Sequence, residues 1–369
     1  MNTQAGKSQM RLIVLPGDGI GPEITAATCA VLAALDQRHG LGLSLEEHTV
    51  GLASLERQGS TLPDAVVQAC EGADGVVLGP VSHLHYPPRD QGGLNPSGDL
   101  RIQLDLFANI RPSRSRAGLP HWGRTPMDLV IVRENTEGFY ADRNMHLGPG
   151  EFMPTPDLAL AVRKVSAQGS RRIAQAAFEL ARTRRRHVTA VHKVNVLKVT
   201  EGLFLREVRD VALAFPDVAL EEQLVDSMAA LLVRDAAHYD VIVTTNMFGD
   251  ILSDEAAELS GSLGLAASLN AGLRHGMAQA QHGSAPDLAG RDLANPASLV
   301  LSAGMLLGWL GRRERRMAFT DAEQQLEAAV DSLLQDANTR THDLGGPLGT
   351  RAWTEALLNR LVATAPRPS

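Results

Sequence analysis

Two aspartates, Asp250 and Asp254, stand four residues apart in a segment that reads Asn-Met-Phe-Gly-Asp-Ile-Leu-Ser-Asp. The apolar run 241–245 before this segment predicts a strand that leads into a helix, and residues four apart share one helix face. Two carboxylates on one face suit a hard divalent cation such as Mg²⁺ or Mn²⁺. Most aspartate pairs at this spacing are solvated helix surface, so the pair alone does not establish a metal site.

Other residues suited to acid–base chemistry accompany this pair. A third carboxylate is Asp226 in Leu-Val-Asp-Ser-Met, and a candidate base is Lys193 in Val-His-Lys-Val-Asn, which ends at Asn195. A phenol is Tyr140, at the end of Arg-Glu-Asn-Thr-Glu-Gly-Phe-Tyr. Taken singly, a surface lysine and a core tyrosine are the more frequent roles, whereas the combination favours an active site.

The elements that must position these residues follow an α/β pattern. Short apolar runs predict strands at 12–15, 75–78, 129–132, 188–191 and 241–243. Between them, apolar residues recur with helical period at 22–34, 170–182, 202–214, 253–263, 296–310 and 321–335. The stretch 143–155 carries two glycines and two prolines, which indicates an arm or loop that leaves the fold.

Composition bounds the class of protein. The 369 residues suit two domains, and the net charge of −7 with 44% apolar residues excludes a general affinity for nucleic acid or an anionic membrane. The basic run 182–187 is interpreted as a cationic helix end. Two cysteines, Cys29 and Cys70, are too few for a disulfide framework and favour a reducing cytoplasm. The N-terminus lacks the pattern of a signal peptide, and the most apolar stretch, 299–310, is about half the ~20 residues of a membrane span.

A glycine-rich turn follows the first predicted strand as Gly17-Asp-Gly-Ile-Gly21-Pro22. The dinucleotide fingerprint G-x-G-x-x-G requires its last glycine where this chain has Pro22. The segment is therefore interpreted as a turn that feeds a helix beside a ligand cleft, and not as the usual dinucleotide-binding (Rossmann) motif.

Several ordered motifs together point to a family. They are Leu100-Arg101, then Asp105-Leu-Phe-Ala-Asn-Ile-Arg111-Pro112, then Val132-Arg133-Glu-Asn-Thr-Glu-Gly138, then His282-Gly-Ser-Ala-Pro-Asp287 with Asn295-Pro296, besides the segment 246–254. With them the chain resembles the β-decarboxylating dehydrogenases, the isocitrate/isopropylmalate dehydrogenase family, from about residue 11 to about residue 311.

The resemblance implies a two-domain α/β fold of the isocitrate/isopropylmalate dehydrogenase type, not a Rossmann fold. The first, cofactor-side domain is expected to combine 1–106 with 262–369. The second, with the metal site and dimer contacts, is expected to be 107–261 with an arm near 143–170. It also implies a homodimer in which each active site takes Lys193 and Asp226 from the partner subunit.

The implied reaction is oxidation of a 2-hydroxy di- or tricarboxylate by a nicotinamide, followed by loss of the 3-carboxylate as carbon dioxide. A cation held by Asp250, Asp254 and the partner's Asp226 is expected to stabilise the charge that builds on the C2 oxygen. Lys193, with Asp226 as a relay, is expected to take the hydroxyl proton, and Tyr140 to deliver a proton to C3. The substrate-binding set is expected to be Arg101, Arg111, Arg133, Asn95, Ser97 and Asn195, in which three guanidinium groups match carboxylates.

The cofactor-binding set implied by the resemblance is His282, Gly283, Ser284, Ala285, Pro286, Asp287, Leu288 and Asn295. The family places the adenosine ribose beside Asp287, whose carboxylate accepts a hydrogen bond from a free 2′-hydroxyl and repels a 2′-phosphate. NAD⁺ is therefore favoured over NADP⁺. Arg291 lies near but is not expected to offset this preference.

The substrate is identified less sharply. Relatives that act on isopropylmalate carry leucines just before the first arginine, whereas this chain has Asn95 and Ser97 there. A polar group at C3, as in isocitrate or homoisocitrate, is slightly favoured. 3-Isopropylmalate, tartrate and D-malate stay open as alternatives. A catalytically silent regulatory subunit of an isocitrate dehydrogenase-like complex is the non-enzyme alternative, against which the retained Tyr140, Lys193 and aspartates argue.

Overall fold

A computed structural model describes residues 9–140, 148 and 150–363. In this part of the chain, one 10-stranded sheet has the order β2-β1-β3-β12-β11-β4-β5-β10-β8-β9. Its strands are β1 (Met10–Leu15), β2 (Leu43–Glu47), β3 (Gly75–Leu78), β4 (Ala108–Arg114), β5 (Asp128–Glu134), β8 (His187–His192), β9 (Ala219–Leu224), β10 (Val241–Thr244), β11 (Leu269–Ala271) and β12 (Gly276–Gln279).

The sheet joins two halves through antiparallel pairing at its centre. Strands β2, β1, β3 and β12 are mutually parallel, as are β5, β10, β8 and β9. Between these groups, β4 pairs antiparallel with both β5 and β11. The inner strands of each group are mostly apolar because both faces of a parallel sheet are covered, and β3 and β10 are buried throughout. The edge strands β2 and β9 each carry two glutamates and are at most half-buried.

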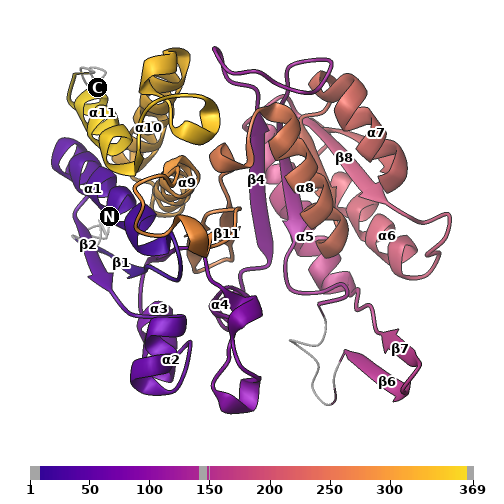
Figure 1. The fold of residues 1–369 in the computed structure, drawn as a ribbon. Coiled ribbons are helices and arrows are strands. Elements are labelled where there is room, and N and C mark those ends of the chain that lie inside the picture. Colours follow the sequence, from indigo (N-terminus) through magenta and orange to yellow (C-terminus); the bar gives the residue numbers. More distant parts are fainter. Residues whose placement is uncertain (1–8, 141–147, 149, 364–369) are drawn as a thin grey trace, which may run out of the picture.

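Helices cover both faces of each half (Figure 1). They are α1 (Gly21–His39), α2 (Leu52–Gln58), α3 (Asp64–Glu71), α4 (Pro96–Gln103), α5 (Ala167–Arg182), α6 (Thr200–Ala212), α7 (Val225–Asp235), α8 (Asn246–Ser260), α9 (Ala297–Glu314), α10 (Met317–Gln335) and α11 (Thr350–Ala363). The burial of α5 shows why such segments are helical: its buried residues Ile173, Ala174, Ala177, Phe178 and Ala181 recur every three or four positions and form one apolar face.

The two ends of the chain lie in the same half (Figure 1). The largest apolar cluster there combines residues 10–41 with residues 267–361, and α9 packs at its centre against α1, α10 and β12. In the other half, two clusters are built from residues 107–243 and 127–256. The α/β fold is confirmed. The domain bounds at 107 and 261 stay a prediction, which this division of the apolar clusters supports.

The predicted elements correspond to observed ones with shifted ends, whereas strands β2, β4, β9, β11 and β12 and helices α2, α3, α4, α7 and α11 were not predicted. The helix expected at 253–263 begins seven residues earlier, at Asn246, so that both Asp250 and Asp254 lie within it. It ends at Ser260 because Gly261 has a positive φ of 150°, and a separate 3₁₀ turn covers Leu263–Leu265. The proline of the glycine-rich turn lies in the first turn of α1, as expected for a helix start.

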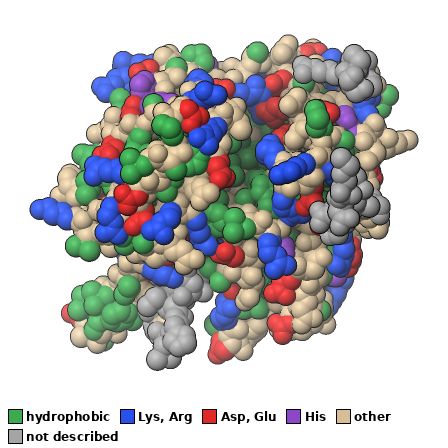
Figure 2. Space-filling model, turned by 180° about the vertical axis from the view of Figure 1, so that it is seen from behind, with side chains coloured by type: hydrophobic (Ala, Val, Ile, Leu, Met, Phe, Trp, Pro, Cys, Tyr) green, Lys and Arg blue, Asp and Glu red, His purple; other side chains and the backbone are tan. Residues whose placement is uncertain are grey.

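A hairpin formed by β6 (Glu151–Thr155) and β7 (Leu158–Ala161) leaves the second half. Every residue of both strands is exposed, including Phe152, Met153, Leu158 and Leu160. Apolar side chains gather on this projection at the lower left of Figure 2. The arm predicted near 143–170 is thus described in part, while residues 143–147 and 149 of that prediction lie outside the described residues.

Within the described ranges, no helix combines the length and the apolar character that crossing a membrane requires.

Candidate active site

Asp250 and Asp254 are held at one place by an arginine from the central strand β4. Nη1 of Arg111 lies 3.3 Å from Asp250 Oδ1 and 3.1 Å from Asp254 Oδ1. The arginine is buried and is oriented by Asn109 and Ser253, which accept from its Nε at 2.5 Å and its Nη1 at 2.8 Å. The carboxylates are 36% and 56% exposed, so a ligand can reach both.

A second buried arginine, Arg133 near the end of β5, forms an ion pair with Asp250. Its Nε and Nη2 donate to Oδ1 of Asn246, the first residue of α8, at 2.9 and 2.7 Å. The hydroxyl of Tyr140 donates to the other oxygen of Asp250 at 3.1 Å, and the guanidinium of Arg133 lies 5.7 Å from the centre of the tyrosine ring. Three of the predicted site residues, Arg111, Arg133 and Tyr140, therefore converge on Asp250 and Asp254.

Close packing of α8 on β5 makes this arrangement possible. A side-chain carbon built on Gly249 would lie 2.7 Å from Cβ of Arg133, which is closer than real carbon atoms approach. The glycine in Phe-Gly-Asp thus lets the helix approach the strand whose arginine pairs with Asp250.

The charges of the cluster keep Asp250 ionised. Burial alone would raise the pKa of Asp250, but the charges of Arg133 and Arg111 and the hydrogen bond from Tyr140 lower it below its ordinary value. Burial, assisted by the nearby charge of Arg133, lowers the pKa of Arg111 to about 10, so this arginine stays cationic at neutral pH. An ionised carboxylate pair on one helix face fits the oxygen ligands that Mg²⁺ and Mn²⁺ take.

Lys193 and Asp226 form a separate pair in the same chain. They follow the carboxyl ends of neighbouring strands β8 and β9, and Lys193 Nζ lies 2.5 Å from Asp226 Oδ1. The hydrogen bond from Lys193 lowers the pKa of the exposed Asp226. Asn195, two residues later, is exposed. Among the described residues, Asp226 does not join Asp250 and Asp254 in a cluster that one ion could occupy.

The segment 95–101 forms helix α4 and does not leave its polar side chains unpaired. The side-chain oxygen of Asn95 caps the helix by accepting from the backbone N–H of Gly98 at 3.2 Å. Ser97 is buried and donates to Gln279 Oε1 at 3.0 Å, and Arg101 donates to the same oxygen at 3.1 Å. Because each side chain already has a partner within the chain, an apolar substituent of the substrate would not leave Asn95 or Ser97 without a hydrogen bond.

The predicted cofactor-binding loop at 282–288 packs against the glycine-rich turn. The backbone N–H of Ile20 donates to Ser284 O at 2.8 Å, and the hydroxyls of Ser284 and Ser82 are 2.8 Å apart. A Cβ on Gly19 would lie 2.0 Å from Ser284 O, so this position requires glycine for the close approach as well as for its φ of 58°. The glycine-rich turn at 17–22, which does not match the dinucleotide fingerprint, thus holds the loop 282–288 in place.

Polar groups of this loop remain available to a ligand. Nδ1 of His282 lies 3.0 Å from Gly283 O, while its Nε2 is buried with no partner. Burial lowers the pKa of this histidine, so the ring is neutral and Nε2 can accept from a ligand amino group. Asp287 is exposed, and Arg291 Nη1 donates to the backbone oxygen of Asp287 at 3.3 Å. Among the described residues, the carboxylate of Asp287 has no ion-pair partner.

The remaining predicted loop residues lie around these groups. Ala285 has a left-handed φ of 35° and precedes the short 3₁₀ turn Pro286–Leu288. Gly283 is exposed and Leu288 is half-buried against the main apolar cluster. The amide of Asn295 donates to Asp343 at 3.0 Å, which ties the loop to the 3₁₀ turn His342–Leu344.

Sequence reasoning missed several amides that orient the predicted residues. Gln281 donates to Asp254 Oδ1 at 2.6 Å and links the metal-ligand candidate to the cofactor loop. Asn109, Asn246 and Gln279 each accept from a predicted arginine. Two of them share a positional signal: Asn246 lies two residues after β10 and Gln279 ends β12, and ligand sites in α/β proteins lie at such strand ends. Asn109, the second residue of β4, has no such signal.

Comparison with known proteins gives consistent matches over nearly the whole chain. Residues 11–359 match the family described as isocitrate/isopropylmalate dehydrogenase. An isocitrate/homoisocitrate dehydrogenase of Thermus thermophilus is 41% identical over 354 residues, which are 95% of this chain and 98% of that protein. A 3-isopropylmalate dehydrogenase of Saccharolobus solfataricus is 38% identical over 337 residues, covering 91% and 95%. The crystal structure of isocitrate dehydrogenase from Methylococcus capsulatus matches with a TM-score of 0.84 and 36% identity, covering 96% and 99%.

Proposed function

Because the chain belongs to the isocitrate/isopropylmalate dehydrogenase family, we propose that it oxidises and decarboxylates a 3-substituted malate with NAD⁺ and a divalent metal ion. The chain is a decarboxylating dehydrogenase that acts on a CH–OH group, and the resemblance found in the sequence is confirmed. The cofactor, the ion and the individual site residues are our proposal.

One observation carries the proposal: Asp250 and Asp254 are gathered with Arg111, Arg133 and Tyr140 at one accessible place. Arg111 and Arg133 pair with these carboxylates. Guanidinium groups bind substrate carboxylates and aspartates bind a divalent ion, so the same cluster offers groups for both.

A bound divalent ion supplies Lewis-acid stabilisation of negative charge on the substrate's C2 oxygen, and NAD⁺ supplies the hydride acceptor. Asp250 and Asp254, with Asp226 of the partner subunit, are the proposed ligands of the ion. Arg101, Arg111 and Arg133 bind substrate carboxylates through planar guanidinium groups.

Proton transfer falls to two further groups in this proposal. Lys193 takes the C2 hydroxyl proton and passes it to Asp226, with which it already shares a hydrogen bond of 2.5 Å. Tyr140 delivers a proton to C3 after carbon dioxide has left, from a hydroxyl that lies 3.1 Å from Asp250. Asn195 completes the substrate contacts from beside Lys193.

The choice of NAD⁺ rests on Asp287. Its exposed carboxylate is not neutralised by Arg291 within the described residues, so it favours a ribose hydroxyl and repels a phosphate at the same place. The buried Nε2 of His282, which has no partner, offers an acceptor for the adenine amino group. The close contact of Gly19 with Ser284 keeps the loop in position for both.

We also propose that the active protein is a homodimer with shared sites. The pair formed by Lys193 and Asp226 does not reach Asp250 and Asp254 within one chain, so the site needs this pair from a second copy. The exposed apolar hairpin β6–β7 fits a role as the arm that joins the copies. The domains 1–106 with 262–369 and 107–261 belong to the same proposal, whereas the cytoplasmic location stays a separate prediction.

Isocitrate or homoisocitrate is the slightly favoured substrate, and 3-isopropylmalate is a second candidate of nearly equal standing. Ser97 and Gln279 place polar atoms beside Arg101, which favours a polar C3 substituent. Asn95 and Ser97 already form hydrogen bonds within the chain. An apolar C3 substituent would therefore not incur the free-energy cost of leaving them unpaired. Relatives with either activity in their names match the chain at similar identity.

A rate screen tests the proposal. Purified protein is assayed with NAD⁺ or NADP⁺, with Mg²⁺ or Mn²⁺, and with isocitrate, homoisocitrate, 3-isopropylmalate, tartrate and D-malate. We expect NAD⁺-dependent turnover that a chelator abolishes. Chelator-insensitive turnover contradicts the metal assignment, and a preference for NADP⁺ contradicts the interpretation of Asp287.

A further inference from the structure

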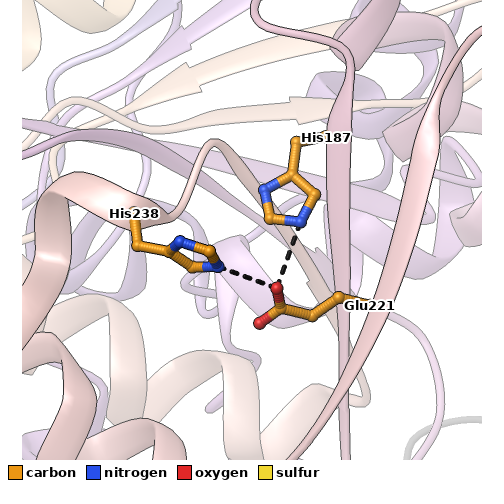
Figure 3. Close-up of side chains that lie close together, drawn as sticks. All are labelled: His187, Glu221 and His238. Atoms are coloured by element: carbon orange, nitrogen blue, oxygen red, sulfur yellow. Dashed lines mark hydrogen bonds and ion pairs between the residues drawn. The ribbon is translucent and has the colours of Figure 1, made fainter.

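Outside the active site, two histidines and a glutamate converge in the second half of the protein. Nε2 of His238 lies 2.8 Å and Nε2 of His187 lies 3.2 Å from the same oxygen of Glu221, as Figure 3 shows. The imidazole rings are nearly perpendicular, with centres 5.2 Å apart. His187 and Glu221 are partly buried and His238 is about half exposed, so the cluster is open to solvent on one side.

The fold brings these residues together through strand register. His187 opens β8 and pairs with Ala219, and Thr189 pairs with Glu221 of the sheet's edge strand β9. Since side chains alternate between the faces of a strand, His187 and Glu221 lie on the face that Val191 also uses. Val191 packs there with residues of α7 and of the turn after it, and His238 ends that turn.

We propose that His187, His238 and Glu221 form a binding site for a borderline divalent cation of the Zn²⁺ type. Two imidazole nitrogens and one carboxylate oxygen are the donor set that Zn²⁺ takes in three-ligand protein sites, and the remaining positions are left to water. Ligands about 2.1 Å from an ion lie roughly 3.0–3.4 Å from one another. The distances of 2.8 and 3.2 Å from Glu221 to the two rings are close to this range, and all three donor atoms lie within 4.8 Å.

This site is separate from the proposed catalytic ion. Lys193 and Asp226 follow the carboxyl ends of β8 and β9, whereas the cluster lies toward their amino ends. The six residues of β8 place the two ends roughly 17 Å apart at the usual rise of a strand. The donor sets also differ, because carboxylates alone favour Mg²⁺ and Mn²⁺ and imidazoles favour Zn²⁺.

The arginines of residues 182–186, just before His187, would repel a cation, but three of them are engaged by other groups. Arg182 pairs with Asp217, and Arg184 pairs with Asp128 and the buried Asp240. The guanidinium of Arg185 donates to a backbone oxygen of Tyr239. Oε2 of Glu221 is thus left to the two histidines, while its Oε1 accepts from Gln223 Nε2 at 3.5 Å. An ion there would connect the edge strand β9 to β8 and to the chain before β10.

The test compares Zn²⁺ binding by the wild type and a His238→Gln variant. Both proteins are full-length, carry no polyhistidine tag, are stripped with a chelator and are titrated with Zn²⁺ by calorimetry in excess Mg²⁺, which occupies the carboxylate site. His275→Gln, which removes a histidine of the β11–β12 turn, is the matched control. We expect the wild type and the control to bind one more Zn²⁺ per chain than His238→Gln, or to bind it at least about tenfold more tightly, since even outer contacts of metal ligands change affinity by 10–100-fold.

Two additional measurements make the result decisive. Co²⁺ should give a visible absorption band in the wild type that is lost in His187→Gln and in Glu221→Gln, because the band reports nitrogen and oxygen ligands around the ion. Unfolding temperatures in the presence of chelator show whether each variant keeps the wild-type fold. Only the variants that keep it enter the comparison of Zn²⁺ binding. Equal Zn²⁺ stoichiometry and affinity in the wild type and the cluster variants overturns the proposal. The three residues then form only an ion pair in which Glu221 is shared by two histidines. Activity is not a readout, so the result does not depend on the proposed substrate.

Discussion

At the scale of single residues, the two helix aspartates have unequal surroundings. Asp250 is bonded by Arg111, Arg133 and Tyr140, so its carboxylate balances buried positive charge. Asp254 is more exposed and bonds only Arg111 and Gln281 among the contacts described. Loss of charge at Asp254 therefore disturbs the protein less and reports on the ion more directly.

We expect Asp254→Asn to shift the Mg²⁺ or Mn²⁺ dependence of turnover to at least about tenfold higher concentrations, because a charged ligand becomes a neutral one. The unfolding temperature should change little, since the side chain is 56% exposed and leaves no cavity. Steady-state rates across a metal titration measure the effect. An unchanged half-saturating metal concentration contradicts the ligand assignment.

Tyr140→Phe should slow the overall oxidative decarboxylation by about 100-fold, the usual contribution of a positioned proton donor. Reduction of a preformed 2-keto acid should slow much less, because that reaction needs no proton at C3. The two reactions are compared by NADH appearance and disappearance. Equal losses assign the tyrosine to positioning Asp250, to which its hydroxyl donates at 3.1 Å.

Asp287→Asn should narrow the preference for NAD⁺ over NADP⁺ by about tenfold or more, since like charges brought together cost several kcal/mol. The variant keeps the shape of the side chain and removes its charge. The ratio of kcat/KM values for the two cofactors is the measurement. Asp292→Asn, a nearby change in the same loop, is the control and should leave that ratio unaltered.

The predictable part of the site is the charged part. The aspartates, Lys193 and Tyr140 were singled out from residue type and spacing, and the arginines from the resemblance to the family, because catalysis requires these groups and little else substitutes for them. The amides that orient them, such as Asn246 and Gln281, were missed. An amide in a sequence has no spacing that distinguishes a buried hydrogen-bond partner from a surface residue, and only the fold shows that it meets an arginine or an aspartate.

At the scale of elements, helix α4 gives Asn95 a local role besides the predicted binding role. Asn95 precedes Pro96 and accepts from Gly98 N, which is the usual arrangement of an N-cap followed by proline. The sequence already contained this signal. The resemblance to the family, in which this segment lies beside the substrate's C3 substituent, led instead to the prediction that Asn95 contacts the substrate.

Asn95→Ala should therefore lower the free energy of unfolding by about 1 kcal/mol through loss of the cap. Asn95→Asp, which caps equally well, should retain stability, and chemical denaturation of both variants measures the difference. Neither should change the ratio of rates with isocitrate and 3-isopropylmalate beyond a small factor if capping is the only role. A large change in that ratio returns Asn95 to the substrate pocket.

Strands β1, β3, β5, β8 and β10 were predicted from their buried apolar runs. The other described strands, β2, β4, β6, β7, β9, β11 and β12, were not predicted. Strands β6 and β7 are exposed and β2 and β9 are at most half-buried, whereas β11 and β12 are buried but only three and four residues long and each includes a polar residue. Periodicity reports burial, so an element that a partner subunit or solvent covers leaves little trace in one sequence.

At the scale of the whole molecule, the separation of Lys193–Asp226 from Asp250–Asp254 permits a complementation test. At a metal concentration that saturates the wild type but is too low for Asp254→Asn, this variant and Lys193→Ala should each show little activity as homodimers. When they are co-expressed, a heterodimer has one site with both defects and one intact site. We expect about a quarter of wild-type activity in the mixed population, because half of the dimers are mixed and half of their sites work. Activity no greater than the sum of the two separate variants contradicts shared sites.

The first half combines strands from the N-terminal and the later part of the chain, and this determines the order in which strands can pair during synthesis. Strands β4, β5, β8, β9 and β10 come from residues 108–244, so that half has all its strands as soon as these residues leave the ribosome. Strand β3 must wait for β12, about two hundred residues later, before its second edge is covered. The N-terminal strands therefore spend most of translation with an open edge, and a nascent chain stalled before residue 276 should be the species most in need of a chaperone.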